Sequence, residues 1–206
     1  MSRTALRASL ALWTRRHQYR LRKLKAARKV GAASKIAHWR RRVDQAQYWI
    51  DRRRSQLKPL RAKALTEARK FIGVMEHGGN NAGAEVSRII RANGGTGPEP
   101  WCGDFVAYVY RHAGSKAVTR AWASVSALGW AGGIKRVNTP LPGDLVRFKF
   151  DHVGIFEKDN HDGTITTVEG NTGASGAVSD SSTGGDGVYR KVRSKSLVND
   201  YRRVTR

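Results

Sequence analysis

The chain contains one cysteine, and the residues around it could do nucleophilic chemistry. Cys102 follows a Pro- and Gly-rich stretch, residues 94–100, and precedes an apolar run that begins at Phe105. This change of composition predicts a helix whose first turn carries the cysteine. Free N–H groups and the helix dipole at that end favour the thiolate, the reactive form of cysteine. The pattern indicates a nucleophile, whereas the common alternative for a lone cysteine is an inert, buried side chain.

Two polar segments downstream could complete such a site. His152 lies just after a predicted strand, and Glu169 and Asn171 lie two residues apart on another. A histidine can take the thiol proton and later give it to a leaving amine, while a third group holds the imidazole in the right tautomer. Because alternate residues of a strand share a face, either Glu169 or Asn171 could orient His152. We expect Glu169 to contact His152 directly and Asn171 to support it.

Two neighbours of the cysteine have roles that the sequence leaves open. Trp101 could pack in the core or line the substrate groove, and we take it as a candidate substrate-binding residue. Asp104 falls in the first helical turn, where the dipole favours a carboxylate. Because a negative charge facing Cys102 would oppose the thiolate, we expect Asp104 to point outward.

The first elements that the spacing predicts are two long helices. Apolar residues recur at intervals of four and three over residues 6–27 and again over residues 36–60, which is the pattern of amphipathic helices with coiled-coil spacing. Gly31 and Ser34 lie between the two segments and suit the end of one helix and the start of the next. We therefore expect an antiparallel helical hairpin over residues 1–58.

The rest of the chain changes from helical to strand patterns. Pro59 marks the boundary, and we expect helices over residues 60–75 and 84–92 before the helix that carries the cysteine. After residue 142, apolar and polar residues alternate in short runs separated by turns, which predicts strands. Helices followed by strands indicate an α+β fold for residues 59–206.

The charge is concentrated in the predicted hairpin. The chain has 39 Lys and Arg against 16 Asp and Glu, and residues 1–70 hold 22 of the basic and 3 of the acidic ones. Such a surface repels itself and usually meets an anion. An anionic wall polymer, an anionic membrane surface and nucleic acid all fit, and a pair of solvated helices is the plain alternative. The sequence leaves this choice, and the oligomeric state, open.

Four segments together resemble the CHAP family of cysteine, histidine-dependent amidohydrolases/peptidases. They occur in the family's order, over about residues 65–205: Trp101–Val106, Pro142–Leu145, His152–Ile155 and Glu169–Asn171. The resemblance implies a papain-like fold with N-terminal helices packed on an antiparallel sheet. It also implies that Cys102 is the nucleophile, His152 the base, and Glu169 with Asn171 the orienting group.

The resemblance further implies a peptidoglycan hydrolase. The bond would be that of an N-acetylmuramoyl-L-alanine amidase or of a stem-peptide or cross-bridge endopeptidase. Arginines interrupt the apolar stretch of residues 8–13, so we expect no signal peptide. A peptidoglycan hydrolase without a signal peptide fits a phage-type lysin. Such an enzyme is made in the cytoplasm of an infected host or carried in a virion, and it acts on the cell wall. The alternative is a non-catalytic basic protein that binds nucleic acid or an anionic membrane through its N-terminal helices.

No metal or cofactor is expected. Some members of the CHAP family have an acidic calcium loop upstream of the cysteine. In this chain the corresponding stretch, residues 76–81, contains one carboxylate, which does not predict a calcium site, and the sequence leaves a calcium requirement open. A single cysteine also excludes an internal disulfide and a cysteine-rich zinc site.

Overall fold

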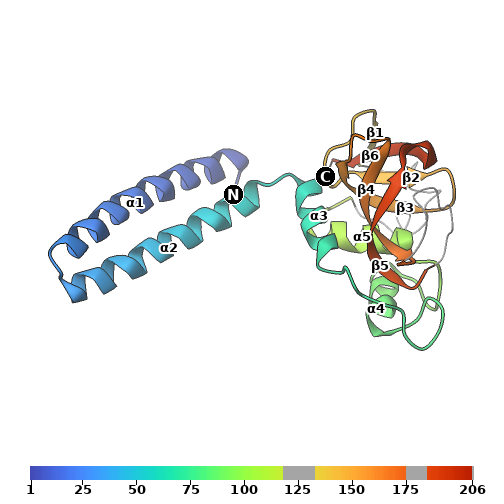
Figure 1. Cartoon of the computed structure of the whole chain (residues 1–206), viewed down its shortest axis with the longest axis horizontal. Helices are drawn as coiled ribbons and strands as arrows, with labels where there is room; N and C mark the ends of the chain where they lie inside the picture. The colour runs from blue at the N-terminus through green and yellow to red at the C-terminus, as the bar shows by residue number, and fades with distance from the viewer. Residues whose placement is uncertain (118–132, 175–184, 206) are drawn as a thin grey trace. The chain divides into compact units, whose positions relative to one another are not determined.

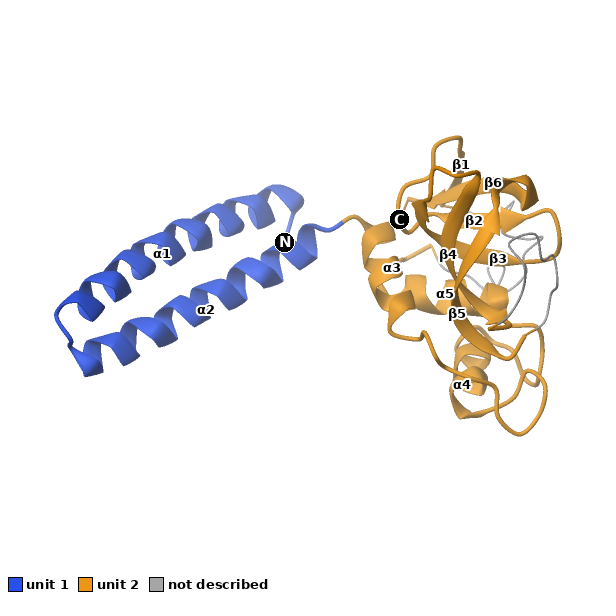
Figure 2. Ribbon diagram, viewed as in Figure 1, with its two compact units in different colours: residues 1–58 blue, residues 59–206 orange. Residues whose placement is uncertain are grey.

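The chain folds into two compact units. Figure 1 shows the computed structural model, which describes residues 1–117, 133–174 and 185–205. Residues 1–58 form the first unit and residues 59–206 the second (Figure 2). In the described parts of the chain, no helix is both long enough and apolar enough to cross a membrane.

The first unit is a hairpin of two long helices, α1 (Arg3–Lys29) and α2 (Ala33–Leu57). The reversal uses Gly31, whose positive φ of 64° suits the residue after a helix end. The residues with 3.5-residue spacing face the partner helix, and the most buried of them are Leu24, Ala27, Ala46 and Ile50. The helical hairpin expected from the sequence is therefore observed.

The second unit has three α-helices and one sheet within the described residues. The helices are α3 (Leu60–Arg69), α4 (Ala84–Ala92) and α5 (Cys102–His112). The strands are β1 (Ile134–Val137), β2 (Leu145–Phe148), β3 (Val153–Asp159), β4 (Thr164–Thr172), β5 (Gly187–Ser194) and β6 (Val198–Val204). Every neighbouring pair is antiparallel, in the order β1-β6-β2-β3-β4-β5. The predicted α+β class is confirmed.

Alternation along the strands separates two apolar clusters. Leu145, Val153 and Ile155 pack in the larger cluster with α3, α4 and α5. Val146 and Phe156, one residue further along the chain, pack in a smaller cluster on the other face. Helix α5 is buried from Cys102 to Tyr110, so it is the central helix of this unit.

Two expected boundaries differ in the structure. The helix that starts at residue 60 ends at Arg69, because the chain turns and residues 73–76 then run beside β5. The Gly73 N–H donates to the Val188 carbonyl, the Val74 carbonyl accepts from the Val188 N–H, and Met75 pairs with Gly187. Strand β1 was not expected from the sequence, because it is only four residues long and its two central residues are charged and exposed, which weakens the strand signal.

Candidate active site

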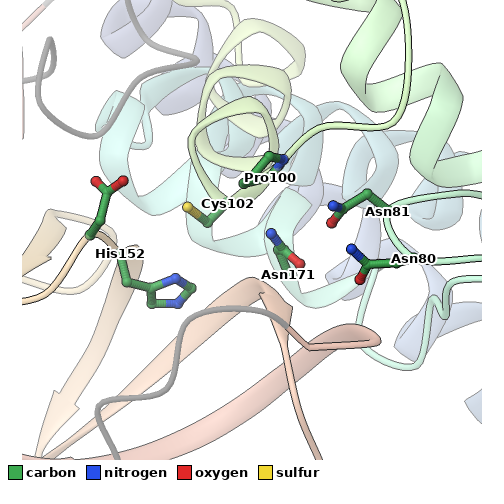
Figure 3. Close-up of a pocket in the computed structure, with 7 residues that line it drawn as sticks. Asn80, Asn81, Pro100, Cys102, His152 and Asn171 are labelled. Carbon is green, nitrogen blue, oxygen red and sulfur yellow. The ribbon is translucent and has the colours of Figure 1, made fainter.

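A cleft in the second unit brings together residues from distant parts of the chain (Figure 3). Its volume is about 250 Å³. Segments before α4, at the start of α5, between β2 and β3, and in β4 supply its lining. The described lining residues are Asn80, Asn81, Pro100, Cys102, Asp151, His152 and Asn171. Three of the four catalytic candidates thus line one cleft, and the fourth, Glu169, lies behind His152.

Cys102 is the first residue of α5, as expected. The thiol is at the cleft although the residue is only 6% exposed. Helix α5 lies close to strand β4 at this point. A Cβ atom on Gly170 would lie 2.7 Å from Cβ of Phe105. The glycine between Glu169 and Asn171 is therefore required for the close approach of the nucleophile's helix to this strand.

His152 is fixed by a tight turn and by aromatic rings. Its backbone N–H donates to the Phe150 carbonyl over 2.7 Å, and its own carbonyl accepts from the Phe148 N–H over 3.1 Å. The imidazole stacks on both phenylalanine rings, with ring centres 5.7 and 5.9 Å away. The residue is 1% exposed, so bulk water does not compete for its nitrogen atoms.

Glu169 contacts the imidazole directly. Its Oε2 lies 2.9 Å from Nε2 of His152, which leaves Nδ1 for the thiol. Thr167 donates to Oε1 over 2.5 Å. Arg193 donates to both oxygens, from Nε to Oε1 over 3.2 Å and from Nη2 to Oε2 over 2.8 Å. The carboxylate is therefore held from two sides while it faces the histidine.

These contacts set the protonation states of the pair. Burial opposes a charge on His152, but hydrogen bonds to Cys102 and Glu169 and the charges of both groups raise its pKa to about 9. Burial would also raise the pKa of Glu169, but His152 and Arg193 lower it to about 2. At neutral pH the imidazole is protonated and the carboxylate ionised.

Asn171 lines the cleft, and its partners lie on the side of the cleft that carries Cys102. With its amide group turned to the orientation that satisfies its neighbours, the side-chain nitrogen donates to Asn81 Oδ1 over 3.3 Å and to the Gly185 carbonyl over 3.2 Å, and the oxygen accepts from the Trp101 N–H over 3.1 Å. Its φ of 54° and a β-bulge between Glu169 and Thr172 break the alternation of the strand. Asn171 thus supports the segment before the nucleophile rather than His152, contrary to the expectation.

Trp101 does not line the groove, and that expectation is wrong. The residue is fully buried, packs edge-on against Phe105 and donates from Nε1 to Glu76 Oε1 over 2.8 Å. The other oxygen of Glu76 accepts from the Asn81 N–H over 2.7 Å. Glu76 therefore ties the residue before the nucleophile to the opposite wall of the cleft.

Asp104 points inward rather than outward. It is 1% exposed, because α5 is buried on all sides at this turn, and Asn93 is the polar side chain that interacts with its carboxyl group among the described residues, without good hydrogen-bond geometry. Burial and the nearby Glu99 raise its pKa to about 7.

No group of three or more His, Cys, Asp or Glu suited to a metal occurs in the described residues. Asp104, Glu99 and the unpartnered Oδ1 of Asn93 offer fewer oxygen ligands than the six to eight that calcium takes.

Sequence reasoning missed three contributions to the site. Arg193 lies in no motif that would single it out from the sequence. Asn80 and Asn81 come from the stretch considered only for calcium, and Asp151 precedes the histidine at the cleft. These residues meet the catalytic candidates only through the packing of separate elements.

The comparison with known protein families agrees with this geometry. Residues 93–171 match the CHAP domain family, a segment that includes Cys102, His152, Glu169 and Asn171. No curated protein and no solved structure matches the chain. A CHAP domain implies amide-bond hydrolysis of the amidase or peptidase kind in peptidoglycan.

Proposed function

Since residues 93–171 match the CHAP domain family, we propose that Cys102 is the nucleophile of a peptidoglycan hydrolase, with His152 as its acid–base partner. The observation that supports this proposal most directly is that both side chains line one cleft, while Glu169 contacts Nε2 of the imidazole. The positive charge of the buried, protonated His152 imidazole favours negative charge on a sulfur atom beside it. The three residues then have the arrangement that acyl transfer needs.

The reaction would proceed through an acyl-enzyme. The Cys102 sulfur attacks the carbonyl carbon of the scissile amide, and the negative charge forms on the carbonyl oxygen. The first N–H groups of a helix have no intrahelical partner, so the start of α5 can stabilise this oxyanion. His152 donates its proton to the leaving amine. Water, deprotonated by His152, then hydrolyses the thioester, and the sulfur leaves as the thiolate beside the imidazolium.

The lining of the cleft supports a peptide amide as the bond cleaved. Glycosidases of the usual kind place two carboxylates across the scissile bond. Among the described lining residues one is a carboxylate, Asp151, and three are asparagines that can pair with amide groups. We therefore propose cleavage in the peptide part, either at the N-acetylmuramoyl-L-alanine bond or within the stem or cross-bridge peptide.

Digestion of purified peptidoglycan tests the proposal. Wild type and Cys102→Ala are compared, and the released fragments are identified by mass spectrometry. We expect fragments from wild type alone. A free lactyl carboxyl with a new alanine amino group would identify the amidase, and a new amino group elsewhere the endopeptidase. Equal fragments from both proteins would contradict the cysteine mechanism.

For the hairpin, we propose a targeting role on an anionic surface of the bacterial envelope. Residues 1–58 contain 18 Lys and Arg and two Asp. A phage-type lysin, made in the cytoplasm or carried in a virion, would use this charge to stay at the wall that the second unit cleaves. The alternative, a non-catalytic protein that binds nucleic acid or membrane through these helices, requires that Cys102→Ala leaves its activity unchanged.

A further inference from the structure

A stacked pair of tryptophans joins the two helices of the hairpin. The rings of Trp13 in α1 and Trp49 in α2 have centres 5.8 Å apart and planes 19° apart. Four guanidinium groups lie over these rings, at 4.9 and 5.7 Å from the centre of Trp13 and at 5.5 and 5.3 Å from that of Trp49. They belong, in that order, to Arg16, Arg20, Arg52 and Arg53, which we call the arginine cluster.

Hydrogen bonds fix three members of the arginine cluster in addition to the rings. Arg20 Nη1 donates to the Arg42 carbonyl over 2.6 Å. Arg52 Nη1 donates to the Tyr48 hydroxyl over 2.9 Å. Arg53 Nε donates to Ser9 Oγ over 3.0 Å, and its Nη1 donates to Gln56 Oε1 over 2.7 Å. Because the side chains are already held, a ligand would immobilise them at a smaller cost in conformational entropy.

The charges of the cluster have no acidic partners within the hairpin. Residues 1–58 are all described, and the one ion pair among them joins Arg54 to Asp51 at 4.0 Å. Burial and the charges of Arg42 and Arg16 lower the pKa of Arg20, so neighbouring cations repel it. Four guanidinium groups that are positioned but not neutralised would be stabilised by an anion.

The geometry favours a phosphate polymer over other partners. A second copy of the hairpin carries the same positive charge and is repelled. A membrane interface or a single-stranded nucleic acid would use exposed tryptophan rings, for insertion or for base stacking. Here the two rings stack on each other and are covered by guanidinium groups. The guanidinium fork matches the oxygens of a phosphate group.

We propose that the arginine cluster binds phosphate groups of a phosphodiester-linked polymer of the bacterial cell wall. The choice of the wall as the source rests on the proposed function, since the second unit acts on peptidoglycan. Helix α1 has 27 residues, which corresponds to about 40 Å. One polymer chain can therefore run along the helices, with its strongest contacts at the arginine cluster and weaker ones at the other basic residues.

The test measures binding of the full-length Cys102→Ala protein, which keeps the hairpin but does not cut the wall. Its ligands are soluble poly(glycerol phosphate), walls that carry such a polymer, and the same walls after hydrofluoric acid has removed it. The test variant changes the arginine cluster to glutamine. A matched control changes four other exposed basic residues of the hairpin to glutamine and lowers the charge equally: Arg3, Arg7, Lys29 and Lys35.

We expect the cluster variant to bind the polymer at least about tenfold more weakly and the control to stay within about threefold. Stripped walls should bind much less protein than intact ones. A further variant with lysine at the four positions keeps the charge but loses the planar fork, and it should also bind more weakly. If the glutamine variant loses helicity in circular dichroism, the lysine variant decides the question.

Three results would overturn the inference: equal weakening in cluster variant and control, undiminished binding to stripped walls, or tighter binding to duplex DNA or phosphatidylglycerol vesicles than to the polymer. None of these depends on catalysis. Polymer binding by a protein whose wild type releases no peptidoglycan fragments would leave this inference standing and refute the proposed hydrolase. The two proposals can therefore fail separately.

Discussion

Arg193 contacts both carboxylate oxygens of Glu169, and both side chains are fully buried. The guanidinium also lies over the rings of Phe148 and Phe150, 5.6 and 5.8 Å from their centres. The same rings stack on His152. The arginine therefore determines where the carboxylate meets the imidazole, and it keeps that carboxylate ionised in an apolar environment.

Replacing Arg193 should reduce activity through Glu169. Arg193→Lys keeps a charge but cannot bond both carboxylate oxygens. We expect kcat to fall about 10- to 100-fold, the loss that is typical when a residue that orients an active-site side chain is replaced. Arg193→Gln leaves a buried carboxylate with one charged partner fewer and should also lower the free energy of unfolding by about 3 kcal/mol or more. Fragment release and thermal denaturation measure the two effects.

Arg190 provides the control for this substitution. It lies on the same strand, β5, and pairs with Glu157 over 2.6 Å, but its side chain is half exposed. We expect Arg190→Lys to leave kcat within about twofold, because exposed ion pairs contribute about 0–1 kcal/mol. Equal losses in the two lysine variants would show that Arg193 acts only as a structural ion pair.

The pKa of His152 predicts the alkaline limit of activity. Because the raised value is about 9, the imidazolium is present below that pH and is lost as the pH rises through it. We expect kcat/KM to fall above about pH 9. Glu169→Gln removes the carboxylate that stabilises the imidazolium, so this limb should move to lower pH and kcat should drop by about 100-fold or more. An unchanged limb would contradict the pairing.

Asn81 should contribute to substrate binding. Its φ of 57° is unfavourable for most residues but not for glycine. Asn81→Gly therefore removes the amide from the cleft without straining the backbone, and we expect KM to rise about tenfold with a smaller change in kcat. Asn81→Ala also removes the amide, but alanine is strained at this positive φ, so this variant should be less stable than the glycine variant. If KM stays constant in the glycine variant, the amide does not contact substrate.

Asp104 should make the protein less stable as the pH rises from about 4 to about 7. Its pKa is raised to about 7, so over this range the folded state holds a proton that the unfolded state has released. Asp104→Asn removes the titration. The difference in unfolding free energy, variant minus wild type, should increase with pH up to about 7 and then level off. Denaturant unfolding at several pH values measures it, and a constant difference would refute the buried carboxyl.

The division into two units predicts the effect of a deletion. A chain that consists of residues 59–206 should fold and retain activity on soluble muropeptides, because its apolar clusters lie within those residues. Its activity on whole cells should decrease at moderate salt, because the basic hairpin is lost. Circular dichroism and turbidity loss measure these outcomes, and an unfolded fragment would show that the boundary is misplaced.

Local patterns in the sequence determined the elements and the identity of the reactive groups. The 3.5-residue spacing predicted the hairpin, and the alternation of apolar and polar residues predicted most of the strands. The resemblance of the cysteine, histidine and glutamate segments to the CHAP family predicted which side chains meet at the site. The helices and strands themselves depend on near neighbours in the chain, whose preferences act before the units are packed.

The tertiary structure decided how the site is supported. Arg193 reaches Glu169 from a neighbouring strand, and Glu76 joins Trp101 to Asn81 across a long loop. Two further features arise only when helix α5 packs on the sheet. One is the bulge that turns Asn171 away from His152, and the other is the burial of Asp104 in the first turn of the helix. Such contacts join residues far apart in sequence, so no local pattern of polarity or spacing encodes them.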